Sequence, residues 1–268
     1  TQVGDEQPML VVLGTRGGLD FPSLAFQGND AGAFGQAYHQ NTFSGGLGGP
    51  IVKNKLFVFG SFQLRGRTDP LQSLLTANTA TLQRLGVSPD SVGQFLGALS
   101  RYGIAPTTSS IPGDRSNDQN QLFLRFDGRL TESHTLMLRF DGQWNDAAAQ
   151  RIASLGLPSS GGSQTRNGFG VMASLTSQLT LFNGAVINEI RAYRSTADQQ
   201  SDPYLSLPAG RVQILSTLAD NVLSTSTLQF GGNAGLPQAS DNVTFESSDE
   251  LSYIPAGSGH RFKLGGLV

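Results

Sequence analysis

The sequence predicts an all-β protein: an antiparallel up-and-down sheet of about nine strands that forms part of a β-barrel. Three observations support this fold class. Apolar and polar residues alternate with a period of two along much of the chain. Short turns alternate with much longer polar segments. Glycine is abundant at 34 of 268 residues, whereas only 14% of residues are charged, against roughly 25% in typical soluble domains.

The strongest strand signal is a pair of similar segments, LFLRFDGRL (122–130) and LMLRFDGQW (136–144). In each, apolar residues alternate with charged ones, and Thr131 opens a tight turn between them. The apolar positions are Leu122, Leu124, Phe126, Leu136, Leu138 and Phe140. The charged positions are Arg125, Asp127, Arg129, Arg139 and Asp141. The pattern therefore predicts a β-hairpin of two strands, near 119–130 and 134–145, with one apolar and one charged face.

The same alternation predicts further strands on both sides of this hairpin. They lie near 23–30, 41–52, 55–65, 167–179, 185–196, 241–254 and 259–268. The strand near 185–196 is expected to place Glu189 and Arg191 on the face opposite Ile190 and Ala192.

The connections between the strands are of two kinds. Short polar turns occur at KNK (53–55), TESH near 132–134, TLFNG (180–184) and PAGSG (255–259). Long polar segments near 66–118, 145–166 and 197–240 alternate with them. A soluble sandwich rarely sorts its loops in this way, but an outer-membrane barrel has short periplasmic turns and long extracellular loops. We therefore expect a transmembrane β-barrel portion.

The longest connection contains the signals of a helix near 88–102. Ser88 can cap the N-terminus, Pro89 suits the first helical position, and Gly103 can follow the last turn. The apolar face would consist of Val92, Phe95, Leu96 and Leu99. We expect a short helix inserted in a surface loop, and no second domain.

The sequence carries no catalytic or cofactor motif. The cluster of Gly45, Gly46, Gly48 and Gly49 lacks the GK[ST] ending of a phosphate loop, and Pro50 with a strand follows it instead of a helix. The glycines are better explained by a strand that another backbone approaches closely. No nucleophile elbow is present. We therefore expect no enzyme and no cofactor.

Metal and nucleic-acid binding are not indicated either. His39, His134 and His260 are far apart and each is expected in a loop or turn, and there is no cysteine. The net charge of −2 gives no reason to expect nucleic acid. Asp127 and Asp141 could mimic a glycosidase pair, but arginines share their face. A lumen lined with paired charges explains that face more simply.

Aromatic residues are expected near the strand ends, at Phe62, Phe126, Phe140, Trp144 and Tyr253. They suit either an aromatic girdle at a membrane interface or an ordinary soluble core. The asymmetry of the loops favours the girdle.

The segment NTFSGGLGGPIVKNKLFVFGSFQ (41–63) resembles the early barrel of bacterial TonB-dependent outer-membrane receptors, in particular those with a carboxypeptidase-regulatory-like N-terminal domain. Segments 120–141, 188–195 and 247–268 resemble the same barrel. The segment MLVVLGTRGG (9–18) is similar to the last plug strand of such receptors, although it departs from the usual pattern.

The resemblance implies an organisation, a location and partners. Residues 1–20 would be the end of the plug and the entry to the barrel, and 21–268 the N-terminal part of the barrel, truncated at its C-terminus. The apolar positions of the hairpin would face outer-membrane lipid. The charged positions, with Glu189 and Arg191, would face the lumen or the plug. Partners would be the TonB complex, through plug regions outside this chain, and an unidentified extracellular ligand at loops 66–118 and 197–240. The expected location is the bacterial outer membrane.

Two other functions remain open from the sequence. A receptor-like barrel could serve surface adhesion or assembly without transport. A soluble all-β carbohydrate-active domain would be a third candidate, and it would pack protein against both faces of the hairpin at 122–144.

Overall fold

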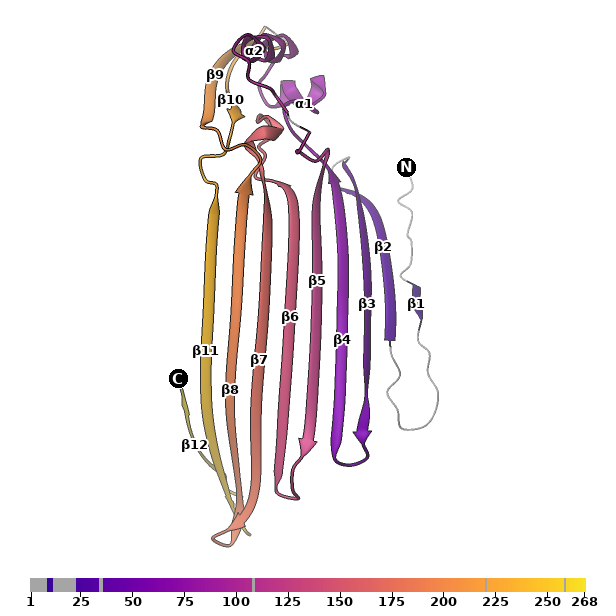
Figure 1. Ribbon diagram of the computed structural model, residues 1–268, viewed down its shortest axis with the longest axis vertical. Helices are drawn as coiled ribbons and strands as arrows, with labels where there is room; N and C mark the ends of the chain where they lie inside the picture. Colours follow the sequence, from indigo (N-terminus) through magenta and orange to yellow (C-terminus); the bar gives the residue numbers. More distant parts are fainter. Residues whose placement is uncertain (1–8, 12–22, 34–35, 108, 220, 258) are drawn as a thin grey trace.

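The computed structural model describes residues 9–11, 23–33, 36–107, 109–219, 221–257 and 259–268. Within them the chain forms one antiparallel sheet of ten strands and a second sheet of two strands (Figure 1). The strands of the large sheet are β1 (Met9–Val11), β2 (Ser23–Ala33), β3 (Gln36–Val52), β4 (Leu56–Pro70), β5 (Asp114–Arg129), β6 (His134–Gln150), β7 (Gly162–Leu181), β8 (Gly184–Pro203), β11 (Gln238–Pro255) and β12 (Phe262–Leu267). They follow one another in sequence order, except that β11 pairs with β8 because β9 (Ala209–Thr217) and β10 (Leu223–Gly231) form the small sheet.

The all-β, up-and-down fold predicted from the sequence is confirmed. Each of the nine expected strands has its counterpart, from β2 to β8 and in β11 and β12. Two strands were not foreseen, β9 and β10. The short β1, which pairs with β2, lies in the segment that resembles the last plug strand. Met9–Val11 belongs to the segment assigned to the plug and the barrel entry, and the rest of residues 1–20 lies outside the described residues.

The strands extend further toward the long loops than the sequence predicted. β5 begins at Asp114 and not near 119, β7 begins at Gly162 and not near 167, and β8 ends at Pro203 and not near 196. The added segments are polar on both faces, for example DRSND and TADQQSDP. Hydrophobic alternation therefore marks only the part of each strand that has one apolar face, and it misses a strand with water on both sides.

The short turns lie together at one end of the large sheet, here called the turn end. At KNK, Asn54 has a φ of 61° and Lys55 N donates to Val52 O at 3.0 Å. β7 and β8 are joined by Phe182 and Asn183 alone, with φ of 52° and 53°. Positive φ at both positions of a two-residue loop matches the strand twist of a tight hairpin.

The glycine cluster lies inside β3, as expected. The ring of Phe59 on β4 lies against it, because a Cβ added at Gly48 would be 3.0 Å from Phe59 Cδ2. Because a glycine has no side chain, Gly48 leaves room for the ring of Phe59 on the neighbouring strand. One expectation for the histidines is wrong: His39 lies within β3, and not in a loop. His134 is the first residue of β6.

At the opposite end, the loop end, three connections pack together into what we call the cap. The cap consists of residues 71–113, 151–161 and 204–237 and contains α1 (Thr79–Arg84), α2 (Pro89–Arg101), the 3-10 turn η1 (Pro158–Ser160), β9 and β10. The expected helix is confirmed, since Ser88 Oγ accepts from Ser91 N at 3.2 Å and Val92, Phe95 and Leu99 are buried. Neither α-helix among the described residues is long and apolar enough to cross a lipid bilayer.

The cap has its own hydrophobic core. Its members come from all three connections: Leu74, Leu82, Val87, Val92, Phe95, Leu99, Leu157 and Leu228. Phe95 on α2 packs edge-on against Phe230 on β10, with ring centroids 5.8 Å apart. The sequence predicts these connections as long polar segments with one short helix. In the structure, apolar residues of the three connections bury one another at this end of the molecule.

Backbone hydrogen bonds also join the three connections. Leu157 N donates to Gln229 O at 2.9 Å, and Gln229 N donates back to Leu155 O at 3.1 Å. On the other side, Leu74 N donates to Gly156 O at 2.9 Å. The segment around Leu157 thus lies between the other two loops and holds them together.

Candidate functional site

The ladder register divides the side chains of the large sheet into two faces. Residues directly opposite each other on paired antiparallel strands share a face. Leu124 lies opposite Phe140 and Phe126 opposite Leu138, whereas Arg125 lies opposite Arg139. The outer face thus carries Leu122, Leu124, Phe126, Leu136, Leu138 and Phe140. The inner face carries Arg125, Asp127, Arg129, Arg139, Asp141, Glu189 and Arg191.

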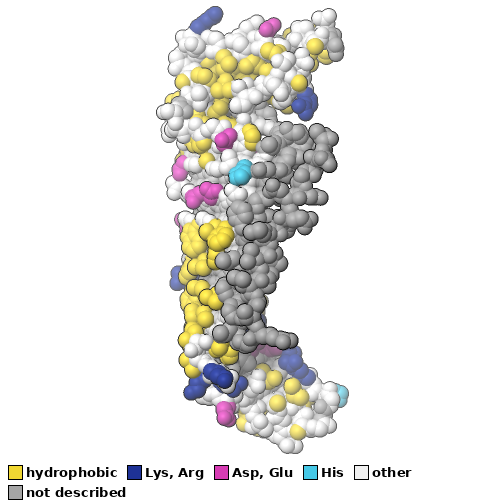
Figure 2. Space-filling view, turned by 90° about the vertical axis from the view of Figure 1, so that its right-hand side faces the viewer, with side chains coloured by type: hydrophobic (Ala, Val, Ile, Leu, Met, Phe, Trp, Pro, Cys, Tyr) yellow, Lys and Arg dark blue, Asp and Glu magenta, His cyan; other side chains and the backbone are white. Residues whose placement is uncertain are grey.

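The outer face is a broad apolar surface with no protein covering it among the described residues. Many of the large exposed hydrophobic side chains belong to it: Phe43, Leu47, Leu64, Leu122, Trp144, Phe169, Leu179, Ile190, Val243, Phe245, Leu251, Phe262 and Leu264. Figure 2 shows hydrophobic side chains in two zones, one along the strands and one at the loop end, with acidic side chains between them.

All five candidate girdle aromatics lie on the outer face. Trp144 lies toward the loop end and its indole covers Gly142, where an added Cβ would come within 2.6 Å of the ring. Tyr253 lies near the turn end and its hydroxyl donates to Phe182 O at 2.7 Å. Phe126 and Phe140 lie deeper within their strands, with ring centroids 6.3 Å apart.

Polar residues interrupt the apolar surface on β8 and β11. One of them is Arg194, which lies opposite Val171 and Phe245, and two others are Asn188 and Asp249. Asp249 lies opposite Ile190, which in turn lies opposite Leu175. Its Oδ1 accepts from Asn188 Nδ2 at 2.6 Å. A carboxylate therefore occupies the same ladder row as the apolar side chains of the neighbouring strands.

The charges of the inner face are arranged in pairs two residues apart on single strands. Arg125 contacts Asp127 at 2.7 Å, Arg139 contacts Asp141 at 2.9 Å and Arg191 contacts Glu189 at 2.7 Å. Because the side chains of residues i and i+2 point the same way from a strand, each pair neutralises itself locally. Asp127 and Asp141 do not form the carboxylate pair considered above, since each pairs with the arginine of its own strand.

A fourth pair of this kind lies closer to the loop end, on β4. Arg67 contacts Asp69 at 2.8 Å, and its guanidinium lies 4.4 Å from the centre of the Tyr38 ring. The contact between Arg67 and Tyr38 thus links the polar parts of β3 and β4 through their side chains.

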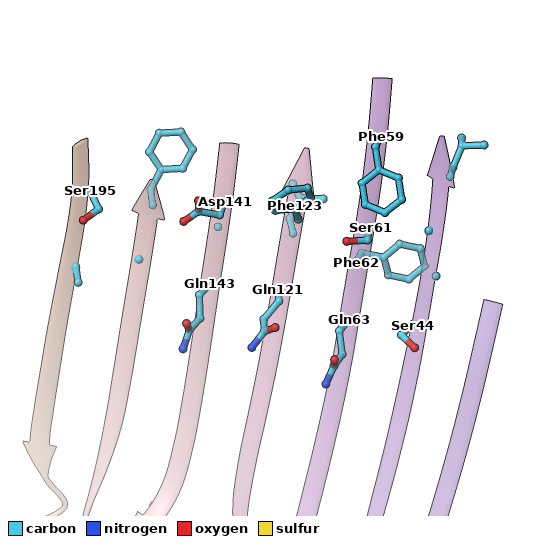
Figure 3. A pocket seen from close by; sticks show the side chains of 18 of the residues that line it. Ser44, Phe59, Ser61, Phe62, Gln63, Gln121, Phe123, Asp141, Gln143 and Ser195 are labelled. Carbon is cyan, nitrogen blue, oxygen red and sulfur yellow. The ribbon is translucent and has the colours of Figure 1, made fainter. Parts of the chain in front are cut away.

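The inner face is hollowed by a cavity of about 810 Å³ that extends from β3 to β8. Figure 3 shows Gln63, Gln121 and Gln143 side by side on neighbouring strands along it. The register places these three residues opposite one another, from β4 to β5 to β6. Among the described residues, their side chains have no hydrogen-bond partner. We call them the glutamine row.

Aromatic and small residues form the rest of the cavity wall toward the turn end. Phe59 and Phe123 lie with ring centroids 6.0 Å apart, and Tyr193 lines the cavity from β8. Gly46 on β3 and Gly168 on β7 also line the cavity, and neither has a side chain that would fill it. Among the described residues that line the cavity, only Asp141 and Arg166 have a formal charge, and Asp141 is paired with Arg139.

The sequence did not single out this cavity. The glutamines occupy inner-face positions of strands that were otherwise interpreted through their charged residues, and Phe123 is an apolar residue on the charged face. The register that aligns three strands is the missing information, because alternation fixes the face of a residue but not its neighbours. Among the described residues, no group of three or more His, Asp or Glu side chains could hold a metal ion.

Long antiparallel strands, short turns at one end, long loops at the other and an apolar outer face define the wall of an outer-membrane β-barrel. The chain belongs to the outer membrane beta barrel domain family, whose model matches residues 24–268. Among curated proteins, none matches the sequence. The protein therefore resides in the bacterial outer membrane and associates with its lipid. The turn end faces the periplasm and the cap faces the outside of the cell.

Proposed function

We propose that this chain is part of the barrel of a TonB-dependent transporter, which binds an extracellular ligand and takes it up with energy supplied through TonB. The observation that carries the proposal is the inner face, which is hollowed by a cavity of about 810 Å³ in strands that lead up to an extracellular cap. A barrel that only displays loops has no need of a ligand-sized hollow in its wall. The resemblance of residues 41–63 to such receptors supports the same function.

The two faces have separate roles in this proposal. The outer-face residues Leu122, Leu124, Phe126, Leu136, Leu138 and Phe140 contact lipid. The inner-face pairs Arg125–Asp127, Arg139–Asp141 and Glu189–Arg191 line the lumen or meet the plug. Extracellular ligand first meets the loops predicted for it, 66–118 and 197–240, most of whose residues form the cap.

The test compares nutrient use in three strains: wild type, a strain without this protein, and a strain without TonB. The strains grow on panels of limiting carbon, iron and cobalamin sources. The proposal predicts at least one nutrient whose uptake is lost in both deletion strains and is restored by the intact gene. Unchanged uptake of every nutrient in the strain without the protein would contradict it.

Surface adhesion without transport is the second candidate, and one observation favours it. The hairpin of β9 and β10 presents apolar side chains outward from the cap, with Leu215 and Leu223 each 65% exposed and Val222 55% exposed. A strain in which Leu215 and Leu223 are both changed to Ser should then lose attachment to surfaces or cells. Loss of attachment together with normal nutrient uptake would select this function over transport.

A further inference from the structure

We propose that the glutamine row is a binding site for a neutral oligosaccharide on its way through the barrel. The inference rests on the proposed transport function and names the chemical class of its ligand. It starts from Gln63, Gln121 and Gln143, which lie opposite one another on three strands and line the cavity. Each amide offers both a donor and an acceptor, and none has a partner among the described residues.

The charges around the cavity favour a neutral ligand. Arg139 and Asp141 beside the row contact each other at 2.9 Å, and Arg125 and Asp127 further toward the turn end contact each other at 2.7 Å. Arg166 is the single lining charge without an ion-pair partner among the described residues. A site for an anionic ligand needs several convergent cations, since these supply the charge-assisted hydrogen bonds that hold it.

Hydroxyl groups suit this surface because each of them, like an amide, donates and accepts a hydrogen bond. Neighbouring strands lie about 4.8 Å apart, so the row presents amides at a regular spacing across three strands. Phe59, Phe123 and Tyr193 supply apolar ring surface on the turn side of the row. A sugar ring has hydroxyls at its rim and C–H groups on its faces. The hydroxyls match the amides of the row, and the C–H faces match the aromatic rings.

A peptide fits the site less well. Peptides are recognised by free sheet edges, apolar grooves, aromatic-lined grooves for polyproline, arginine clusters or nests of backbone N–H groups. The glutamine row lies in the interior of a sheet where β4, β5 and β6 already pair on both sides. Its backbone groups are therefore committed to the ladder, and only the amide side chains remain to bind a ligand.

Further amides lead from the row toward the cap. On the inner face, Asn117 and Gln119 continue β5 beyond Gln121, and Asn145 continues β6 beyond Gln143. Gln164 and Gln199 lie at the same end of β7 and β8. Two arginines lie among these amides: Arg65 opposite Gln119, where its Nη2 donates to Gln40 Oε1 at 2.8 Å, and Arg166 opposite Asn145. A hydrogen-bonding surface made mostly of amides thus connects the extracellular loops with the cavity.

The experiment measures equilibrium binding to outer membranes isolated from cells that produce the intact protein, with membranes lacking it as the blank. The probes are fluorescein-labelled maltohexaose, cellohexaose and xylohexaose, the anionic hexagalacturonate, the cationic chitosan hexamer and an uncharged Ser-Gly hexapeptide. No energy source is present, so failure to bind would bear on this site and not on transport itself.

We expect saturable binding of at least one neutral hexasaccharide and no comparable binding of the charged probes or the peptide. The double variant Gln121→Ala and Gln143→Ala should weaken it at least tenfold. Gln178→Ala is the matched control, because Gln178 is on the inner face of β7 near the turn end and does not line the cavity. It should leave binding unchanged.

A second variant, Gln143→Glu, keeps the size of the side chain and should also weaken binding of the neutral probe at least tenfold. Heat-dependent migration in SDS gels verifies that each variant is folded. Three results would overturn the proposal: no neutral hexasaccharide binds, a bound one is insensitive to both variants, or a charged probe or the peptide binds through the glutamines.

Discussion

The wall formed by β3 to β8 and the cap at its extracellular end use the same apolar residue types in opposite arrangements. In the wall, Leu122 and Phe169 point outward and are 41% and 51% exposed. In the cap, Leu157 and Leu228 point inward and are fully buried. The hydrophobic core clusters among the described residues all lie at the loop end.

This difference indicates which solvent surrounds each region. A structure in water buries its apolar side chains against one another, as the cap does. A wall in lipid has no need to do so, since hydrocarbon chains cover its outer face. Both regions satisfy their backbone polar groups in the same way, through antiparallel ladders and loop-to-loop hydrogen bonds.

The largest predicted effect is on the core of the cap. Leu157→Ala removes a fully buried side chain between two other loops and should cost about 2–5 kcal/mol of local stability. Hydrogen exchange measured by mass spectrometry should then increase in all three segments of the cap together, with the strands of the wall unchanged. Leu215→Ala, at an outward-facing position, is the control. Faster exchange confined to 151–161 would show that the loops do not form one unit.

In the wall, a charge on the outer face should be the most damaging change. Leu138→Arg places a cation opposite Phe126 and should cost about 2–4 kcal/mol near the bilayer midplane. Urea unfolding in lipid vesicles measures this cost. Met137→Arg is the matched control, one residue away on the inner face opposite Asp127. Equal costs for the two variants would contradict the assignment of the faces.

The polar residues Asn188 and Asp249 on the outer face allow the opposite substitution, from polar to apolar. Replacing Asp249 and Asn188 together by Leu removes a carboxylate and its 2.6 Å amide partner from a row of the outer face. The double variant should be more stable in vesicles, by less than the ~2–4 kcal/mol that a Lys or Arg costs at the midplane. Lower stability of the double variant would show that this patch contacts protein or water.

The smallest effect is predicted for the inner-face ion pairs. The side chains of Arg125 and Asp127 are 48% and 34% exposed, and pairs of this kind contribute about 0.2–1 kcal/mol. Arg125→Gln should therefore lower the free energy of unfolding by no more than that, and less at high salt. A loss as large as that of Leu138→Arg would mean that the pair is buried against another part of the protein.

The sequence predicted most of the wall but little of the cap. In the wall, the period of two in segments such as 122–130 and 136–144 reports a single physical fact, one apolar and one polar face. That fact also placed Arg125 and Leu124 on opposite faces before any pairing was known. The polar ends of the strands were missed because water on both sides removes the alternation.

The cap could not be predicted because its core depends on contacts between distant loops. Ser88 and Gly103 revealed α2, since capping is local. That Phe95 meets Phe230, or that Leu157 lies between two loops, is not encoded in any local period. The alternation RVQILST in β9 was present in the sequence and could have revealed the hairpin. The glutamine row needed the register of three strands.

The central claim is that the outer face of the wall contacts lipid and the inner face does not. The protein contains no cysteine, so single cysteines at positions 136 to 141 of β6 can each carry a nitroxide label in the folded protein in vesicles. Spin relaxation by molecular oxygen, which concentrates in hydrocarbon, reports contact with lipid. The account predicts high oxygen accessibility at 136, 138 and 140 and low accessibility at 137, 139 and 141. The opposite phase, or no period of two, would contradict it.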